Sequence, residues 1–294
     1  GIKLREAGFD DFLIFEKNEG LGGTWRDNSY PGCACDVESH LYSFSFAPNP
    51  EWSQSYSPQS EILAYLERTA RDRGLMPRMR FGHRVERCAW QQDEGHWRLE
   101  TSRGVFTADF VIGGPGGLSQ PAIPTLQGLD RFQGETFHSA RWNHGHSLRG
   151  KRVAVIGTGA SALQFVPEIQ PEVQSMRVFQ RTPAWVLPRI ERKISAKERA
   201  RFRRFPILQK LERGVIYARR ELLALGLNNP SLMKPVQKLA VAYLERKVKD
   251  PVLRAKLTPN FTIGCKRILL SRTYLPALVQ DNVVRLLAYS AIAQ

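Results

Sequence analysis

The most constraining feature of this chain is a glycine-rich turn between a strand and a helix, KRVAVIGTGASALQFVPEI, with a second strand, MRVFQR, after it. A short β-branched run, a glycine turn and an apolar-periodic helix in that order predict a βαβ unit. In such a unit Gly157 makes the tight turn, Gly159 admits a pyrophosphate at the helix N-terminus, and Ala162 lets the helix pack closely. We predict a dinucleotide site rather than a plain βα turn, formed by Gly157, Thr158, Gly159, Ser161 and Ala162.

The residues at the end of the second strand indicate which dinucleotide is bound. An NAD site places an acidic side chain there, which holds the ribose 2′-hydroxyl. This chain instead has Gln180, Arg181 and Thr182. A guanidinium at that point suits a 2′-phosphate, so we predict NADPH, with Arg181 and Thr182 among its contacts.

A partial second nucleotide motif lies near the start of the chain. The run DFLIFEK predicts a short buried strand, and Glu16 stands at its end, as a ribose-binding acid does. The segment GLGGTW then puts flexible backbone and a large aromatic ring where α/β ligands bind. Taken by itself, Glu16 is equally compatible with a surface acid. Two nucleotide sites imply electron transfer from NADPH to a second cofactor, for which flavin is the usual acceptor.

The remaining segments predict an α/β chain with two Rossmann-like dinucleotide-binding domains. Residues 2–7 and 59–73 have helical patterns, and HRVERCAWQQ, HWRLET and VFTADFVIGG predict a strand meander that leads to a buried strand at 109–113. We expect an FAD-binding domain at 1–133, a linker at 134–150, and an NADPH-binding domain at 151–294 with a mostly helical insertion at about 189–256.

The net charge of +15 is concentrated in that insertion, which holds 19 Lys/Arg and 6 Asp/Glu between Arg189 and Lys256. Apolar residues at helical spacing run among these charges, namely Ile207, Leu208, Leu211 and Val215. We expect a solvated helix face and no nucleic-acid binding. The alternative is a basic surface that meets phosphate, an acidic partner or, by peripheral contact, a membrane.

Composition excludes other classes. No run approaches the roughly 20 apolar residues that span a bilayer, and the first residues lack the layout of a signal peptide, so we expect a cytoplasmic location. The cysteines are too few and too irregularly spaced for a disulfide framework or a zinc site. We expect no bound metal and four reduced thiols, Cys33, Cys35, Cys88 and Cys265.

Six motifs in order give the chain a family resemblance. They are GLGGTW, YPGCACDVES, FxGxxxHxxxW, GTGASA, QRTPAW and GCKR. Together they resemble the class B flavoprotein monooxygenases of Baeyer–Villiger type, over nearly the whole chain. The third motif matches that family's fingerprint at Phe132, Gly134, His138 and Trp142, and departs from it at Asn143, where Pro or Asp is usual. Related N-hydroxylating and S-oxidising enzymes have Phe or Tyr in place of the tryptophan.

The resemblance implies a reaction. In the family NADPH reduces FAD, the reduced flavin captures O₂ as a C4a-peroxide, and this peroxide attacks a ketone to give an ester or lactone. Arg267 matches the arginine that stabilises the peroxide, Asp36 the aspartate that orients this arginine, and Lys266 a lysine that joins Arg181 on the 2′-phosphate. The implied FAD contacts are Glu16, Gly23, Thr24, Trp25, Asp36, Tyr42 and, through its backbone, Val85.

We count His138 with Arg267 and Asp36 as catalytic, since the fingerprint lies on the linker and implies that His138 couples the two domains. The resemblance also implies an FAD glycine turn before residue 1 and a returning segment after residue 294. We therefore expect a fragment of a longer enzyme that by itself binds FAD weakly or not at all. Two alternatives stay open: a flavoprotein that oxidises amines or sulfur compounds or merely consumes NADPH, and a non-catalytic basic binding module.

Overall fold

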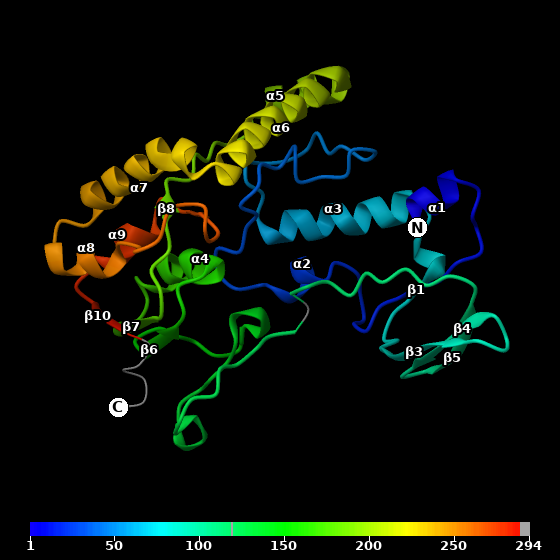
Figure 1. The fold of residues 1–294 in the computed structure, drawn as a ribbon, viewed down its shortest axis with the longest axis horizontal. Coiled ribbons are helices and arrows are strands. Elements are labelled where there is room, and N and C mark those ends of the chain that lie inside the picture. Colours follow the sequence, from blue (N-terminus) through cyan, green and yellow to red (C-terminus); the bar gives the residue numbers. More distant parts are fainter. Residues whose placement is uncertain (119, 289–294) are drawn as a thin grey trace. The chain divides into compact units, whose positions relative to one another are not determined.

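The computed structural model describes residues 1–118 and 120–288, which fall into two compact units (Figure 1). One comprises Gly1–Ser29 with Gln59–Pro121, and the other comprises Tyr30–Pro58 with Ala122–Gln294. The segment that carries YPGCACDVES thus packs with the second unit and not with its sequence neighbours. The predicted domain limits refer to cofactor binding, which packing alone does not test, so they stay predictions.

The first unit is built from short elements around one long helix. Its helix α3 buries the face formed by Ile62, Tyr65, Thr69 and Ala70, as the apolar spacing requires. The strands β1 and β2 pair in parallel. The predicted helices at 2–7 and 59–73 are confirmed. The run DFLIFEK forms a strand of only two residues, which is half-buried and not buried as predicted. The elements up to this point are α1 (Ile2–Glu6), β1 (Ile14–Phe15), α2 (Thr24–Asp27), α3 (Gln59–Asp72), η1 (Met76–Arg78) and β2 (Met79–Arg80).

An antiparallel meander, β3 (Val85–Gln91), β4 (His96–Thr101) and β5 (Gly104–Ala108), completes this unit and confirms the predicted meander. The predicted buried strand at 109–113 is wrong. Phe110 is 87% exposed and Ile112 78% exposed, and no described strand pairs with them. A buried strand needs hydrogen-bonded neighbours, so its apolar composition alone was not enough.

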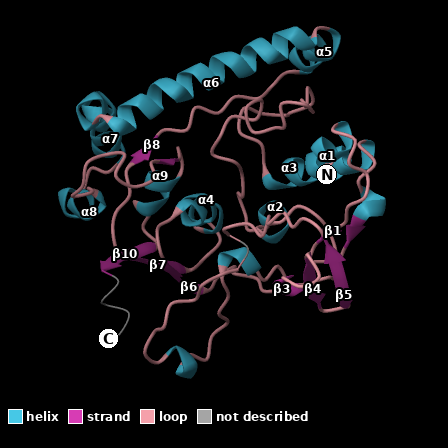
Figure 2. Ribbon diagram, turned by 45° about the vertical axis from the view of Figure 1, so that its right-hand side comes forward, coloured by secondary structure: helices cyan, strands magenta, loops and turns pink. Residues whose placement is uncertain are grey.

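The second unit contains the βαβ motif predicted at the glycine turn. The strands β6 (Arg152–Ile156), β7 (Ser175–Gln180) and β10 (Val283–Ala288) form a parallel sheet in the order β10-β7-β6. Figures 1 and 2 both show α4 (Ala160–Ile169) lying over β6 and β7. Two short 3₁₀ turns, η2 (Leu129–Arg131) and η3 (Ser139–Arg141), precede this sheet.

The basic segment is mostly helical, as predicted. Met233 and Ala240 of this segment form a buried core with Trp185 and Ile263, which lie just outside it. Among residues 1–118 and 120–288, no helix is both long and apolar enough to cross a membrane. The helices of the basic segment are α5 (Ala196–Arg204), α6 (Pro206–Asn228), η4 (Pro230–Met233), α7 (Lys234–Lys247) and α8 (Pro251–Leu257). The strand β8 (Val186–Leu187) precedes the segment and pairs in parallel with β9 (Leu269–Leu270), which follows it and is followed by α9 (Tyr274–Leu278).

Candidate functional site

The glycine turn has the geometry that a dinucleotide requires. Gly157 has a φ of 102° and its N–H donates to the carbonyl of Phe179 at 2.9 Å. Gly159 caps α4 without a side-chain hydrogen bond, and a Cβ added to it would meet nothing within 4 Å. Ala162 is buried, 6% exposed. The N-cap glycine therefore offers no side chain to accept from the first N–H groups of α4, and the space in front of Gly159 is open.

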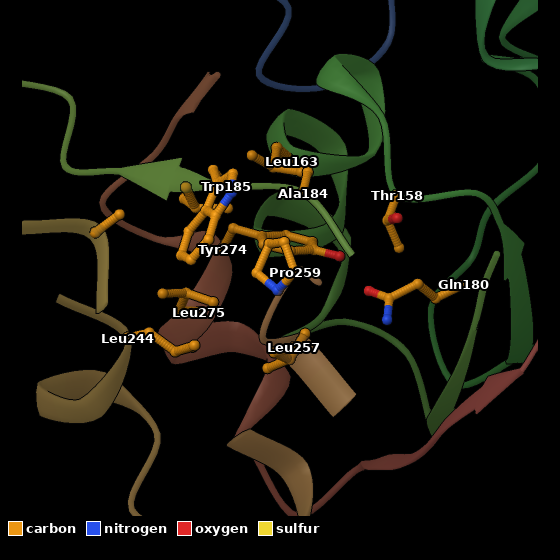
Figure 3. A pocket seen from close by; sticks show the side chains of 12 residues that line it. Thr158, Leu163, Gln180, Ala184, Trp185, Leu244, Leu257, Pro259, Tyr274 and Leu275 are labelled. Carbon is orange, nitrogen blue, oxygen red and sulfur yellow. The ribbon is translucent and has the colours of Figure 1, made fainter. Parts of the chain in front are cut away.

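A pocket adjoins this turn at the carboxyl ends of β6 and β7 (Figure 3). Thr158 and Gln180 line one side of it, and Trp185 and Tyr274 lie opposite. The Tyr274 hydroxyl is buried and has no hydrogen-bond partner among the residues that the structure describes. Burial raises the pKa of this phenol, so it remains a neutral donor. A ligand with an acceptor atom would satisfy it.

The residues predicted to bind the 2′-phosphate lie in two segments, one directly after β7 and one just before β9. Arg181 is exposed and Thr182 half-buried directly after β7. Lys266 is exposed, and its Nζ lies 4.8 Å from the centre of the Phe261 ring. Their joint role on a 2′-phosphate stays a prediction.

Helix α4 also holds the YPGCACDVES segment, through a residue that the motifs did not single out. The Tyr30 hydroxyl donates to Gln164 Oε1 at 3.0 Å, and Gln164 Nε2 donates to the Ala34 carbonyl at 2.9 Å. Gly32 has a φ of 75°, and a Cβ there would lie 2.9 Å from the Gln164 carbonyl oxygen. Ser161 hydrogen-bonds Tyr30 from the same helix. The glycine in this motif is thus needed for the close approach to α4.

The two residues expected to carry the oxygen chemistry are brought together. Arg267 Nη2 donates to Asp36 Oδ2, although 231 positions separate them in the chain. The Arg267 side chain is 64% exposed and that of Asp36 27%. An ion pair this exposed contributes about 0–1 kcal/mol to stability, so its main effect is to fix the direction of the guanidinium.

The predicted FAD contacts divide between the units. Glu16 follows β1 and its carboxylate accepts from the Asn18 N–H at 2.9 Å. Gly23, at φ 49°, precedes Thr24 and Trp25 at the start of α2. Val85 opens β3 in the same unit and is 41% exposed. Asp36 and Tyr42 belong to the other unit. FAD binding by these residues stays a prediction.

The fingerprint residues have local structural roles. His138 caps η3, with its Nδ1 accepting from the Ala140 N–H at 3.0 Å. The Trp142 ring packs against Phe165 of α4, with 5.3 Å between centroids. A Cβ on Gly134 would lie 2.5 Å from the Phe132 ring, which is 60% exposed and free to turn aside. The predicted coupling role of His138 remains a prediction beyond this capping contact.

Asn143, the position that departs from the fingerprint, is integrated into the linker. Its Nδ2 donates to Glu135 at 2.7 Å and its Oδ1 accepts from the Gly145 N–H at 3.0 Å. An aspartate would lose the donated bond, and a proline both. The departure therefore has a local structural reason.

The cysteines are free thiols, as predicted. Burial raises the pKa of Cys33 to about 11 and that of Cys35 to about 12, which makes both poor nucleophiles. Within the described ranges, no three His, Cys, Asp or Glu side chains are grouped to hold a metal ion.

Similar proteins agree with this geometry. The family model described as flavin-binding monooxygenase-like matches residues 6–216. Proteins named Baeyer-Villiger monooxygenase from Streptomyces coelicolor and Pseudomonas aeruginosa are each 54% identical over 96% of this chain and 54% of their own length. The chain thus spans about half the length of these curated relatives.

Solved structures show the same fold. An oxidised steroid monooxygenase bound to NADP is 32% identical with a TM-score of 0.84, over 99% of this chain and 63% of that one. OTEMO in complex with FAD and NADP is 29% identical with a TM-score of 0.85, over 98% and 62%. The predicted α/β class with Rossmann-like dinucleotide-binding domains and a helical insertion is confirmed. The chain belongs to the flavin-binding monooxygenase-like family.

Proposed function

We propose that this protein is a flavin-dependent monooxygenase that uses NADPH and O₂ to insert oxygen into a ketone, giving an ester or lactone. The observation that carries the proposal is the Asp36–Arg267 ion pair, in the unit that also presents an open glycine turn. The identity to two proteins named Baeyer-Villiger monooxygenase supports the same reaction. Amine and sulfur oxidation are the alternatives to be tested.

The residues present fit the two cofactors that the proposal requires. NADPH would rest its pyrophosphate on the N-terminus of α4 beside Gly159, with Arg181 and Lys266 on its 2′-phosphate. FAD would contact Glu16, Gly23, Thr24, Trp25, Asp36, Tyr42 and Val85. Bound FAD supplies the activation of O₂ once NADPH has reduced it.

Arg267 would act as the fixed cation of the site. A developing negative charge in a site that excludes water is stabilised strongly by a cation already in place. Asp36 keeps the guanidinium directed and balances its charge. His138 would act from the linker, through the η3 turn that it caps.

The reaction is tested with the FAD-loaded protein on panels of ketones, sulfides and amines. The amounts of NADPH consumed, oxygenated product formed and peroxide released are compared for each substrate. With at least one ketone, we expect the amount of oxygenated product to be close to the amount of NADPH consumed. Efficient oxidation confined to sulfides or amines, or peroxide as the sole product, would overturn the assignment.

Cofactor preference gives a separate prediction for Arg181. Replacing Arg181 by Ala removes a charge-assisted contact of about 1.5–3 kcal/mol, so we expect the KM for NADPH to rise roughly 10- to 150-fold. The KM for NADH should hardly change, because NADH lacks the 2′-phosphate. Arg177→Ala, which removes an exposed arginine on β7 just before Arg181, is the matched control. Equal changes for both coenzymes would contradict the assigned contact.

A peripheral membrane contact is a second candidate activity, favoured by one face of α6. Ile207, Leu211 and Val215 are 59–64% exposed and follow one another at helical spacing. Lys210 is exposed beside them, and α5 adds further arginines, Arg201, Arg203 and Arg204. An apolar stripe flanked by cations suits the surface of an anionic bilayer.

Co-sedimentation with phosphatidylcholine vesicles, with and without phosphatidylserine, tests this contact. We expect binding only to the anionic vesicles, weakened by salt. Leu211→Ser should weaken the affinity for the anionic vesicles about tenfold or more, since burying a leucine side chain contributes about 1.5–3 kcal/mol. Leu239→Ser on α7, also exposed, is the control. Equal binding by the two variants would exclude the α6 face.

A further inference from the structure

The CDVES segment contains a second acid that the reaction leaves without a role. Glu38 is only 8% exposed and lies two residues from Asp36. Its Oε1 accepts from Arg219 Nη2 at 2.6 Å, and its Oε2 accepts from Arg220 Nε at 3.0 Å. Burying a carboxylate is costly unless it is paired, and here two guanidiniums from α6 pair it.

The same arginine reaches the catalytic segment itself. Arg220 Nη2 donates both to Glu38 and, at 3.4 Å, to the backbone carbonyl of Asp36. One planar guanidinium therefore joins the Glu38 side chain to the backbone that carries the Asp36 carboxylate. Because a guanidinium presents its donors in a fixed fork, the contact restrains direction as well as distance.

Further contacts from α6 hold the rest of this segment. Arg213 Nη1 donates to the carbonyls of His40, Leu41 and Ser43 at 2.8–3.0 Å. Gln209 Nε2 donates to the Asn49 carbonyl at 2.7 Å. The spacing of Gln209, Arg213 and Arg220 places them on one face of the helix. This polar face of the insertion thus binds a long loop that has no regular structure to fix it.

We propose that Glu38 is a positioning residue for the reaction, which it serves by clamping the Asp36 segment to α6 through Arg220. The inference rests on the proposed function, in which Asp36 directs Arg267. Loosening the clamp lets Asp36 shift and leaves Arg267 less well directed. The fraction of reduced flavin that transfers oxygen to substrate then falls, and the fraction that releases peroxide rises. NADPH should still reduce the flavin, because the glycine turn belongs to other elements.

The test uses the FAD-loaded protein with Glu38→Gln, which keeps the side-chain volume and removes the charge. We expect the ratio of oxygenated product to released peroxide to fall about tenfold, less than the ~10²-fold of a full 1 Å misplacement. The anaerobic rate of flavin reduction by NADPH should stay within about twofold of wild type. Arg220→Lys keeps the charge and a single donor group without the planar fork, and should restore part of the ratio that Arg220→Ala loses.

The matched control is Glu198→Gln, which breaks a bidentate pair with Arg192 elsewhere in the insertion. Circular dichroism melting compares the stability of the two variants. A similar melting temperature with an altered product ratio only in Glu38→Gln supports positioning. An unchanged ratio in Glu38→Gln, or an equal fall in Glu198→Gln, overturns it.

A double-mutant cycle with Asp36→Asn separates positioning from general destabilisation. If Glu38 acts through Asp36, Glu38→Gln should change the ratio little once Asp36 is already Asn. Multiplicative losses would overturn the proposal. If the wild-type protein oxygenates sulfides or amines but no ketone, the proposed function is wrong. The same double-mutant cycle, measured on that sulfide or amine, still decides the role of Glu38. If no substrate is oxygenated, the rate of peroxide release is measured for each variant of the cycle instead.

Discussion

Arg267→Ala is expected to lower the rate of ketone oxygenation about 10²–10³-fold, the cost of removing one preorganised charge contact from a developing anion. Flavin reduction by NADPH should fall far less, because the dinucleotide site that we propose is the α4 turn. The two steps are measured separately, by anaerobic reduction of the flavin in a stopped-flow instrument and by product yield in air.

Two controls accompany this experiment. Arg272→Ala removes an exposed arginine five residues along the same segment and should leave both steps unchanged. Asp36→Asn keeps the Arg267 charge but removes its ionic partner, so we expect a smaller loss of oxygenation than in Arg267→Ala. Undiminished ketone oxidation by Arg267→Ala would falsify the role assigned to the cation.

The second large effect is expected at the glycine turn, where two glycines differ in what they need. Gly159 has ordinary extended backbone and open space at its Cβ, so Gly159→Ala should change the free energy of unfolding by no more than about 0.5 kcal/mol. The added methyl occupies the space where the pyrophosphate would approach. A misfit of about 1–3 kcal/mol raises the KM for NADPH roughly 5- to 150-fold.

Gly157→Ala should show the opposite pattern. Its φ of 102° is strained for any residue with a Cβ, at a cost of about 1–3 kcal/mol, while its Cβ would also meet nothing within 4 Å. We expect a lower melting temperature and a smaller change in KM than for Gly159→Ala. If both variants lose stability and keep NADPH affinity, the turn is structural and binds no dinucleotide.

Local patterns predicted the second unit well. The elements β6, α4 and β7 follow one another in the order that the βαβ pattern predicts, because a β-branched run and a glycine turn specify their own backbone. The ion pair of Asp36 with Arg267 came from family motifs, since no local pattern links residues 231 positions apart. The strand predicted at residues 109–113 is wrong because apolar composition does not show whether another strand lies alongside to pair with it.

The basic insertion shows where sequence patterns stop being informative. Its charges predict a solvated face, yet Arg213 and Arg220 hydrogen-bond to the loop that carries Glu38. The apolar side chains of Ile207 and Leu211 are instead exposed. The usual expectation that the apolar side of a helix is the buried one therefore holds only in part on α6, where Ile216 is buried but the stripe from Ile207 to Val215 is not. Gln164 was missed for a similar reason, because nothing in its own neighbourhood announces a bond to a loop 130 positions earlier.

The clamp between Glu38 and Arg220 also sets an order of events during synthesis. Its two partners are 182 positions apart, so the acid emerges from the ribosome long before its arginine. At about 5–20 residues per second, that interval is roughly 10–40 s. Throughout it, the Asp36 loop has neither α6 nor Arg267 to bind. The acidic side chains of this loop therefore stay without their α6 partners for that interval.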